Sequence, residues 1–341
     1  MDRQFKVAIV GATGLVGETM ISVLEERGFP VEKLFALASD RSLGRNLTFR
    51  DKSLGVHQLK GFDFSQADIA LFSAGAETSR EYAPRAVAAG CWVIDNTSEF
   101  RLHDGVPLVV PEVNLHALDA LNSPAIIANP NCSTIQLVVV LKPLHDAAGI
   151  ERIDVVTYQS ASGAGRAAVE ELARQSIHVL AGKGPVELEG DYKQTAFNCI
   201  PHIDEFLENG YTREEMKLVL ETKKILGEPQ LRVNATAVRV PVFYGHSEAV
   251  HITTRRPLSA TQARELLRNA PGVTVMDEPR VGGYPTAATE AANRDTVYVG
   301  RIREDLDPDR GLNLWVVADN VRKGAATNSV QIAEALARRP I

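Results

Sequence analysis

A cysteine stands where an apolar strand gives way to an apolar helix. Ile126–Ala128 is predicted to end a buried strand, Asn129–Thr134 follows it, and a helix is predicted to begin at Ser133. The free N–H groups and the positive dipole end of such a helix favour the thiolate of Cys132 over its thiol. Because a thiolate attacks a carbonyl carbon, we predict that Cys132 is a nucleophile; a buried structural thiol is the alternative.

Distant segments offer the partners that a catalytic cysteine needs. Gln159 ends a predicted strand and leads into Ser160–Arg166, a turn rich in Gly and Ser in which backbone can approach a ligand closely. Arg239 shares a strand face with small alanines that would leave room for a bound carboxylate, although a structural ion pair is the alternative. His246 lies in a turn before another strand and titrates in the range of general acid/base catalysis, although a lone turn histidine is usually a surface residue.

A glycine pattern near the N-terminus indicates a dinucleotide site. Gly11–Gly17 follows the predicted strand Lys6–Val10 and opens the predicted helix Leu15–Arg27, so its backbone N–H groups can hold a pyrophosphate. After the second strand, Ala38–Ser42 offers a guanidinium and two hydroxyls where an NAD enzyme usually has an acidic residue for the ribose. This favours NADP as the cofactor, although Asp40 could itself bind the ribose. The predicted cofactor-binding residues are Gly11, Thr13, Gly14, Leu15, Val16, Ser39, Arg41, Ser42, Ser162, Gly163 and Asn320.

The 341 residues are long enough for two domains. In the first, apolar strands alternate with helices, which predicts an α/β, Rossmann-like parallel sheet. After Cys132 the strands are longer and some alternate, which predicts an α+β domain with a mostly antiparallel sheet. We place the nucleotide domain at 1–128 plus 319–341 and the catalytic and dimerisation domain at 129–318. The expected segments are strands at 33–38, 69–73, 92–95, 154–159, 236–242 and 249–253, helices at 78–89 and 325–338, and a loop at 182–194.

Composition argues against several other classes of protein. The net charge of -6, with a pI near 5.8 and no long run of like charge, argues against a nucleic-acid or a basic membrane surface. Cys91, Cys132 and Cys199 lie far apart without ligand spacing, so neither a disulfide framework nor a metal site is expected. We find no signal-peptide pattern and no apolar run of membrane-spanning length. We therefore expect a globular, soluble, cytoplasmic protein with small-molecule partners.

Taken together, these segments resemble those of the aspartate-semialdehyde dehydrogenases, over essentially the whole chain and in the family's order. The segments that carry the resemblance are Gly11–Gly17, Asp95–Arg101, Asn129–Thr134, Ser162–Arg166, Phe197–His202 and Arg239–His246.

The resemblance implies a role for each matching residue. Cys132 would be the nucleophile and His246 the acid/base, with Gln159 orienting the acyl intermediate. Arg239 would hold the substrate α-carboxylate and Glu214 would lie near its amino group. The phosphate would be bound by Lys217 together with Arg101, and Asn131 is also assigned to the substrate. From sequence alone, the stretch of Glu214 to Lys217 would instead be interpreted as a solvated helix face.

The implied reaction is the NADP-dependent, reversible reductive dephosphorylation of β-aspartyl phosphate to aspartate semialdehyde, on the branch that leads to lysine (with diaminopimelate), threonine and methionine. In the oxidative direction Cys132 would add to the aldehyde, His246 would take the hydroxyl proton, and phosphate would release the thioester left by hydride transfer. The family also implies a homodimer formed through the second domain.

Two rival functions remain. N-acetyl-γ-glutamyl-phosphate reductase has the same Cys and His chemistry, but Asn131, where that reductase usually has glycine, and the Asp95–Arg101 segment favour the aspartate enzyme. The other rival is a catalytically silent paralogue that binds nucleotide. Since Cys132, Gln159, Arg239 and His246 are all present, we expect an active enzyme.

Overall fold

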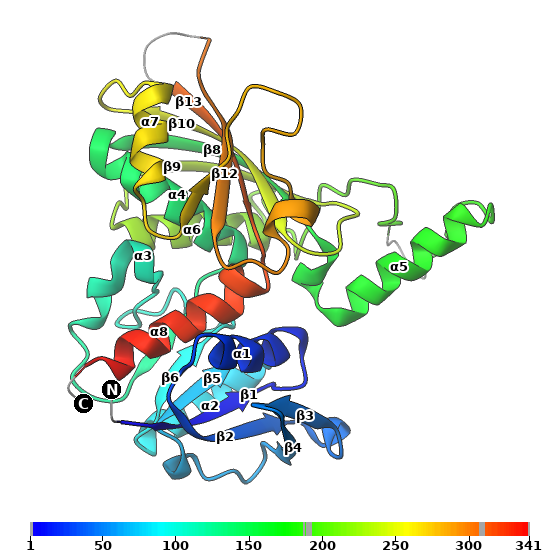
Figure 1. Ribbon diagram of the computed structural model, residues 1–341, viewed down its shortest axis with the longest axis vertical. Coiled ribbons are helices and arrows are strands. Elements are labelled where there is room, and N and C mark those ends of the chain that lie inside the picture. Colours follow the sequence, from blue (N-terminus) through cyan, green and yellow to red (C-terminus); the bar gives the residue numbers. More distant parts are fainter. Residues whose placement is uncertain (1–2, 187, 189–192, 307–310, 340–341) are drawn as a thin grey trace. The chain divides into compact units, whose positions relative to one another are not determined.

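The structure is a computed structural model that describes residues 3–186, 188, 193–306 and 311–339. The chain divides into two compact units, one formed by Met1–Asn131 with Gly324–Ile341 and the other by Cys132–Lys323 (Figure 1). Among the described residues, none of the helices combines the length and the apolar character needed to cross a bilayer.

The first unit is built on a seven-stranded sheet. Its order is β3-β4-β2-β1-β5-β6-β7, and the neighbours pair in parallel except for β3 and β4. The prediction of a Rossmann-like, mostly parallel sheet is therefore confirmed. The strands are β1 (Phe5–Val10), β2 (Val31–Ala38), β3 (Asn46–Phe49), β4 (Lys52–Gln58), β5 (Ile69–Phe72), β6 (Trp92–Asp95) and β7 (Ile126–Ala128).

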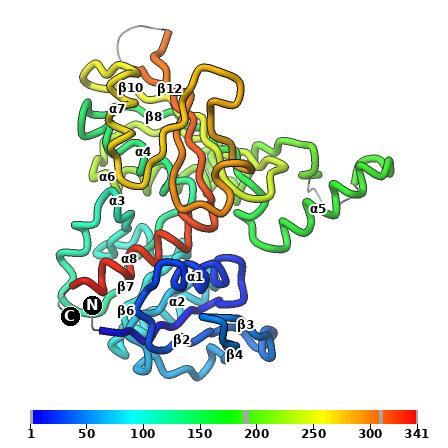
Figure 2. The backbone as a smooth tube through the Cα atoms, viewed as in Figure 1, coloured from blue at the N-terminus to red at the C-terminus, as the bar shows by residue number. Residues whose placement is uncertain are grey.

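Helices complete the core of this unit. The central strands are buried on both faces, as their continuous apolar runs predict. Helix α1 ends where Gly28 adopts a positive φ of 62°, the usual helix stop. The tube in Figure 2 shows the C-terminal helix α8 beside α1 and α3, so both ends of the chain contribute to one core. The helices are α1 (Leu15–Glu26), α2 (Ala76–Ala88), α3 (Pro111–Asn114) and α8 (Asn328–Ala337).

The second unit is built on a six-stranded sheet with the order β11-β12-β13-β10-β8-β9. The pairs β8-β10, β10-β13 and β12-β13 are antiparallel, whereas β8-β9 and β11-β12 are parallel. The mostly antiparallel sheet is thus confirmed. The strands are β8 (Ile150–Gln159), β9 (Arg232–Arg239), β10 (His246–Thr254), β11 (Val273–Val275), β12 (Val297–Glu304) and β13 (Gly311–Ala318).

The two faces of this sheet differ. Buried and half-buried residues alternate along β8, β10 and β13, and the buried set packs against α4. The opposite face holds half-buried side chains such as Val156, Tyr158 and Trp315. Figure 1 shows α5 projecting away from this sheet. The helices are α4 (Cys132–Ala148), α5 (Arg166–Leu180), α6 (Arg213–Leu226) and α7 (Ala260–Arg268).

Three local predictions were wrong at their boundaries. Helix α4 begins at Cys132 itself rather than at Ser133. Strand β9 ends at Arg239, before Pro241, which has no N–H to donate to a sheet. His246 is not in a turn but is the first residue of β10, because it pairs with Ala318 of β13. Part of the loop expected at 182–194, residues 187 and 189–192, lies outside the described residues.

Candidate active site

Cys132 is the first residue of α4, so its side chain starts at the helix end where N–H groups lack carbonyl partners in the same helix. The segment before it is held by a chain of amides. Asn129 donates from Nδ2 to Asn96 Oδ1 at 2.7 Å, and Asn328 donates to Asn129 Oδ1 at 2.7 Å. The thiol of Cys132 is half-buried. This arrangement suits a thiolate nucleophile that is positioned by rigid backbone.

His246 is fully buried, contrary to the surface position expected for a turn histidine. Its Nδ1 accepts a hydrogen bond from the Ser160 backbone N–H at 3.0 Å. A backbone N–H can only donate, so the proton of the neutral imidazole lies on Nε2. Nε2 itself is buried without a hydrogen-bond partner among the described residues. Burial, with a further contribution from Arg239, lowers the pKa of His246 to about 3, so the ring is neutral near pH 7.

An amide oxygen ties together the segments around this histidine. The hydroxyls of Ser160 and Ser162 donate to Asn320 Oδ1 at 3.1 and 2.9 Å, and the Gly245 N–H donates to the same atom at 3.0 Å. Asn320 and Ser162, which the sequence assigned to the cofactor, therefore also hold the backbone on both sides of the imidazole.

Arg239 ends β9 and approaches the same turn. Its Nη1 donates to the Ser160 carbonyl at 2.6 Å. Burial lowers the pKa of Arg239, while the charges of Glu214 and Cys132 oppose this shift, which places the guanidinium within electrostatic range of both groups. Gly163 leaves space for these side chains, because a Cβ there would lie 3.0 Å from Arg239 Nη1 and 3.1 Å from His246 Nε2.

The first turn of α6 carries a buried charged group. Glu214 is 6% exposed and accepts from Gln159 Nε2 at 3.1 Å. Lys217 donates to Glu214 at 3.0 Å and to Asp204 at 2.8 Å. Although burial opposes its charged form, Glu214 and Asp204 hold the pKa of Lys217 above its ordinary value. The interpretation of this stretch as a solvated helix face was therefore wrong.

Sequence reasoning missed Asp204, which links this charged group to a cavity. The cavity has a volume of about 450 Å³, and Arg239 and Asp204 both line it. A cationic and an anionic side chain in one small cavity suit a ligand that carries both charges. The remaining lining residues are Lys193, Thr195, Ile200, His202 and Ile203.

The glycine loop of the first unit forms a tight cradle. A Cβ at Gly11, whose φ is 90°, would lie 2.7 Å from the Ser73 carbonyl oxygen, and a Cβ at Gly17 would lie 2.2 Å from the Gly11 carbonyl oxygen. Only glycine fits at these two positions, as a dinucleotide fingerprint requires. Thr13 Oγ1 also donates to Ser42 Oγ at 3.0 Å, joining this loop to the segment after β2.

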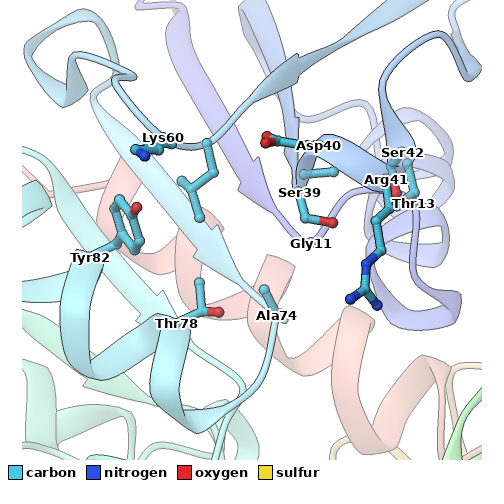
Figure 3. A pocket seen from close by; sticks show the side chains of 12 residues that line it. Gly11, Thr13, Ser39, Asp40, Arg41, Ser42, Lys60, Ala74, Thr78 and Tyr82 are labelled. Atoms are coloured by element: carbon cyan, nitrogen blue, oxygen red, sulfur yellow. Dashed lines mark hydrogen bonds between the residues drawn. The ribbon is translucent and has the colours of Figure 1, made fainter.

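A pocket of about 480 Å³ opens beside this cradle. In Figure 3, Arg41 lies on the opposite side of the pocket from Lys60 and Tyr82. The side chain of Asp40 accepts a hydrogen bond from Gln58, which occupies one of its carboxylate oxygens. Lys60, Thr78 and Tyr82 were not predicted from sequence. Lys60 follows the carboxyl end of β4, whereas Thr78 and Tyr82 lie on α2, the helix that follows β5.

Arg101 also belongs to the first unit. It is 7% exposed, and its Nη2 donates to the Asn96 carbonyl at 2.9 Å. Asp95 beside it is buried and accepts from Ser79 and Thr97. Burial raises the pKa of Asp95 in spite of these bonds and of the Arg101 charge.

Known families match both units. Residues 6–121 match the family described as semialdehyde dehydrogenase, NAD binding domain, and residues 141–323 match semialdehyde dehydrogenase, dimerisation domain. Fold, glycine cradle and thiol site together define a semialdehyde dehydrogenase with a nucleotide-binding and a dimerisation domain.

Relatives that match nearly the whole chain show which kind of semialdehyde dehydrogenase it resembles. The aspartate-semialdehyde dehydrogenase of Legionella pneumophila is 58% identical over 338 residues, covering 99% of this chain and 97% of that protein. The Vibrio cholerae aspartate semialdehyde dehydrogenase II complexed with ASA has a TM-score of 0.96 at 55% identity and covers 100% of both chains. The Candida albicans enzyme with NADP has a TM-score of 0.76 at 26% identity, covering 98% of this chain and 99% of that chain.

The chain belongs to the aspartate-semialdehyde dehydrogenase family, and it is an enzyme with that activity. These relatives favour an aspartate-semialdehyde dehydrogenase over an N-acetyl-γ-glutamyl-phosphate reductase. They also favour an active enzyme over a silent paralogue.

Proposed function

We propose that this enzyme catalyses the reversible, NADP-dependent reductive dephosphorylation of β-aspartyl phosphate to aspartate semialdehyde through a thioester on Cys132. The observation that carries this proposal is a neutral imidazole and a buried guanidinium bonded to Ser160, together with a buried carboxylate bonded to Gln159. The helix-start thiol lies within electrostatic range of that guanidinium. A thiolate that takes up the acyl group divides one difficult exchange into two easier ones.

His246 holds its proton at Nε2 against the oxygen of the reacting carbonyl. When the Cys132 thiolate adds to the aldehyde, the negative charge moves to that oxygen, and the Nε2–H stabilises it as a hydrogen-bond donor. The Ser160 N–H on Nδ1 supports this role and opposes the abstraction of a hydroxyl proton, because Nε2 has no lone pair in this tautomer. Hydride exchange is the chemistry that a bound nicotinamide supplies.

The substrate is held by groups of opposite charge. We assign its α-carboxylate to Arg239, which can pair with both oxygens. The amino group is assigned to Glu214. The side-chain amide of Gln159, whose Nε2 donates to Glu214, orients the acyl group. Lys217 and Arg101 are assigned to the phosphate. Asn131, next to Cys132, completes the substrate contacts.

We propose NADP as the preferred cofactor. The glycine cradle of Gly11, Gly14 and Gly17 would hold the pyrophosphate, and Arg41 with Ser39 and Ser42 would bind the ribose phosphate. The hydrogen bond between Gln58 and Asp40 supports this choice, because it engages the acidic side chain that would favour NAD. The further contacts that we assign to the cofactor are Thr13, Leu15, Val16, Ser162, Gly163 and Asn320.

The cofactor assignment is tested by removing one guanidinium. Arg41→Ala is expected to raise KM for NADP by about tenfold or more, since a charge-assisted hydrogen bond to phosphate contributes about 1.5–3 kcal/mol, while KM for NAD changes little. Arg45→Ala removes an exposed arginine that does not line the pocket and serves as the control. Equal losses with both cofactors would contradict the assignment.

We also propose that the chain forms a homodimer through the half-buried face of the second sheet. Tyr158 and Trp315 lie on this face with ring centroids 5.5 Å apart, next to Val156 and Ala249. An apolar sheet face of this kind is typical of an interface between identical subunits. The projecting α5, with Ile177 70% and Leu180 76% exposed, would reach the second copy.

A reduced Cys132 is needed for catalysis, which supports a cytoplasmic location.

The experiment that tests the reaction is phosphate-dependent reduction of NADP with aspartate semialdehyde, run beside N-acetylglutamate semialdehyde. We expect turnover of the first aldehyde that disappears without phosphate. Cys132→Ser should reduce kcat by at least about a thousandfold, because a hydroxyl remains protonated near pH 7 and is the weaker nucleophile. A serine variant that keeps most of its turnover would contradict the thioester mechanism.

A further inference from the structure

A glutamate lies inside the core two residues after the candidate catalytic histidine. Glu248 is 0% exposed and stands on β10, on the same sheet face as His246. Neither carboxyl oxygen has a hydrogen-bond partner among the described residues. An ionised carboxylate in such a place would be strongly destabilising, so the group requires either a partner or a proton.

The nearest polar group is the amide of Gln136, on the first turns of α4. Gln136 is fully buried, and its Nε2 makes a long contact of 3.5 Å with the carbonyl oxygen of His246. Its side chain interacts with the Glu248 carboxyl, and its Oε1 has no donor among the described residues. The Gln136 amide lowers the pKa of Glu248, but complete burial raises it by more, so the carboxyl holds a proton. A protonated Glu248 has a donor to offer, and Gln136 Oε1 is the acceptor beside it that lacks one.

The same buried layer continues to the substrate side. Thr157 of β8 is directly opposite Glu248 in the antiparallel pair and faces the same side of the sheet. The Thr157 hydroxyl accepts from Gln159 Nε2 at 3.3 Å, and Gln159 also bonds Glu214. Glu248 therefore lies beside Gln136, which contacts the His246 carbonyl, and opposite Thr157, which accepts a hydrogen bond from Gln159.

We propose that Glu248 is a positioning residue that acts as a neutral carboxylic acid, donating to Gln136 so that this amide holds the backbone at His246. The inference builds on the proposed role of His246 in the reaction. Gln136 lies one helical turn after Cys132, so the link from acid to amide to backbone carbonyl connects the elements that carry the nucleophile and the imidazole. Burial raises the pKa of Glu248 well above its ordinary value in spite of the opposing effect of Gln136, as this role requires.

Two variants separate positioning from mere space filling. Glu248→Gln keeps a neutral donor of the same shape and is expected to retain kcat within about twofold. Glu248→Leu keeps the volume without a donor and is expected to lower kcat by about tenfold or more, with KM for the aldehyde within about threefold, because misplacing the imidazole affects the reacting geometry more than binding.

Each kinetic outcome decides the proposal. A Leu variant with wild-type kcat would show that Glu248 only fills space, and a Gln variant as slow as the Leu variant would show that an ionised carboxylate is needed. Glu248→Gln is also expected to melt no lower than the wild type, since the unfolded chain exposes an ionised glutamate whereas the folded one holds a proton.

A spectroscopic measurement keeps the proposal testable if Glu248→Leu fails to fold. Infrared difference spectra of wild type and Glu248→Gln near pH 7 should show one carboxylic-acid C=O band that is lost in the variant. Glu151→Gln, a half-buried glutamate on β8, is the control and should leave the band unchanged. A wild-type spectrum without that band would overturn the proposal.

The infrared result does not depend on catalysis, so failure of this inference can be told from failure of the proposed function. Full turnover by His246→Ala would rule out the proposed role of His246. The protonation of Glu248 would then still be tested by the infrared band alone. If the wild-type spectrum lacks the band while His246 is still required for turnover, only the proposed role of Glu248 is overturned.

Discussion

At the scale of single residues, one backbone N–H decides which nitrogen of His246 carries the proton. The donor belongs to Ser160, 86 residues earlier in the chain. Because Nδ1 is held as an acceptor, the imidazole can offer only a donor to a substrate oxygen. In the proposed reaction, His246 would therefore act like an oxyanion-hole amide, and the thiolate of Cys132 would need no base.

His246→Gln should distinguish a donor from a base. A glutamine amide offers an N–H but no basic lone pair, so it is expected to keep at least about tenfold more activity than His246→Ala, which should lose about a hundredfold or more. The measurement is kcat with aspartate semialdehyde and phosphate. If the Gln variant is as slow as the Ala variant, general-base catalysis by His246 is favoured instead.

The buried His246 also makes stability depend on pH. Its pKa falls from 6.5 to about 3 on folding. Below pH 6.5 the unfolded histidine binds a proton that the folded one does not, so the free energy of unfolding decreases by about 1.4 kcal/mol for each pH unit from 6.5 towards 3. Denaturant unfolding at several pH values should show a shallower decrease for His246→Gln. Identical slopes for variant and wild type would contradict the depressed pKa.

At the scale of elements, a capping box at the start of α6 positions the residues that we assign to the substrate. Thr212 caps the helix by accepting from the Glu215 N–H, and Glu215 accepts from the Thr212 N–H at 2.7 Å. The same glutamate accepts from the Ala237 N–H of β9 at 3.0 Å. One capping box thereby ties the helix that carries Glu214 and Lys217 to the strand that carries Arg239.

Thr212→Ala is expected to lower the free energy of unfolding by about 1 kcal/mol, the usual contribution of an N-cap. It should also raise KM for the aldehyde and for phosphate, because the turn that holds Glu214 and Lys217 loosens. Ser259→Ala removes the equivalent capping box of α7 and is the matched control. The control should cost similar stability with unchanged KM; unchanged KM in both variants would count against the proposed role of α6.

At the scale of the whole molecule, the second sheet uses its two faces differently. One face is buried under α4, and the other keeps apolar side chains half-buried. Residues 285–291 of the same chain cover part of this face, around Trp315. In the proposed homodimer a second copy would cover more of it, in keeping with the dimerisation-domain match.

Val156→Arg is expected to convert the dimer into a monomer, because it places a charge in the centre of the proposed apolar interface. Leu220→Arg, at a position that is 39% exposed on α6, is the control and should remain dimeric. Sedimentation or light scattering measures the mass of each variant. A Val156→Arg protein that stays dimeric while folded would place the interface elsewhere.

The local features of this protein were predictable from sequence. The strand, glycine turn and helix of the first unit follow in order along the chain, and so do the strand end, Cys132 and α4. Such signals depend on neighbours within a few residues, which is why periodicity and glycine position predict them. Arg239 was also placed on the correct strand face, because alternation along a strand is a local property.

The amino-acid sequence by itself determined the two folds and the helix-start thiol, and through family resemblance it supplied the proposed set of site residues. Only the tertiary structure decided the proton on Nε2 of His246, the burial of Glu214, and the contact of Glu248 with Gln136. The physical reason is that a charge state or a tautomer depends on desolvation and on hydrogen-bond partners. Those partners come from segments far apart in the chain, and their meeting is visible only after the sheet and helices have packed.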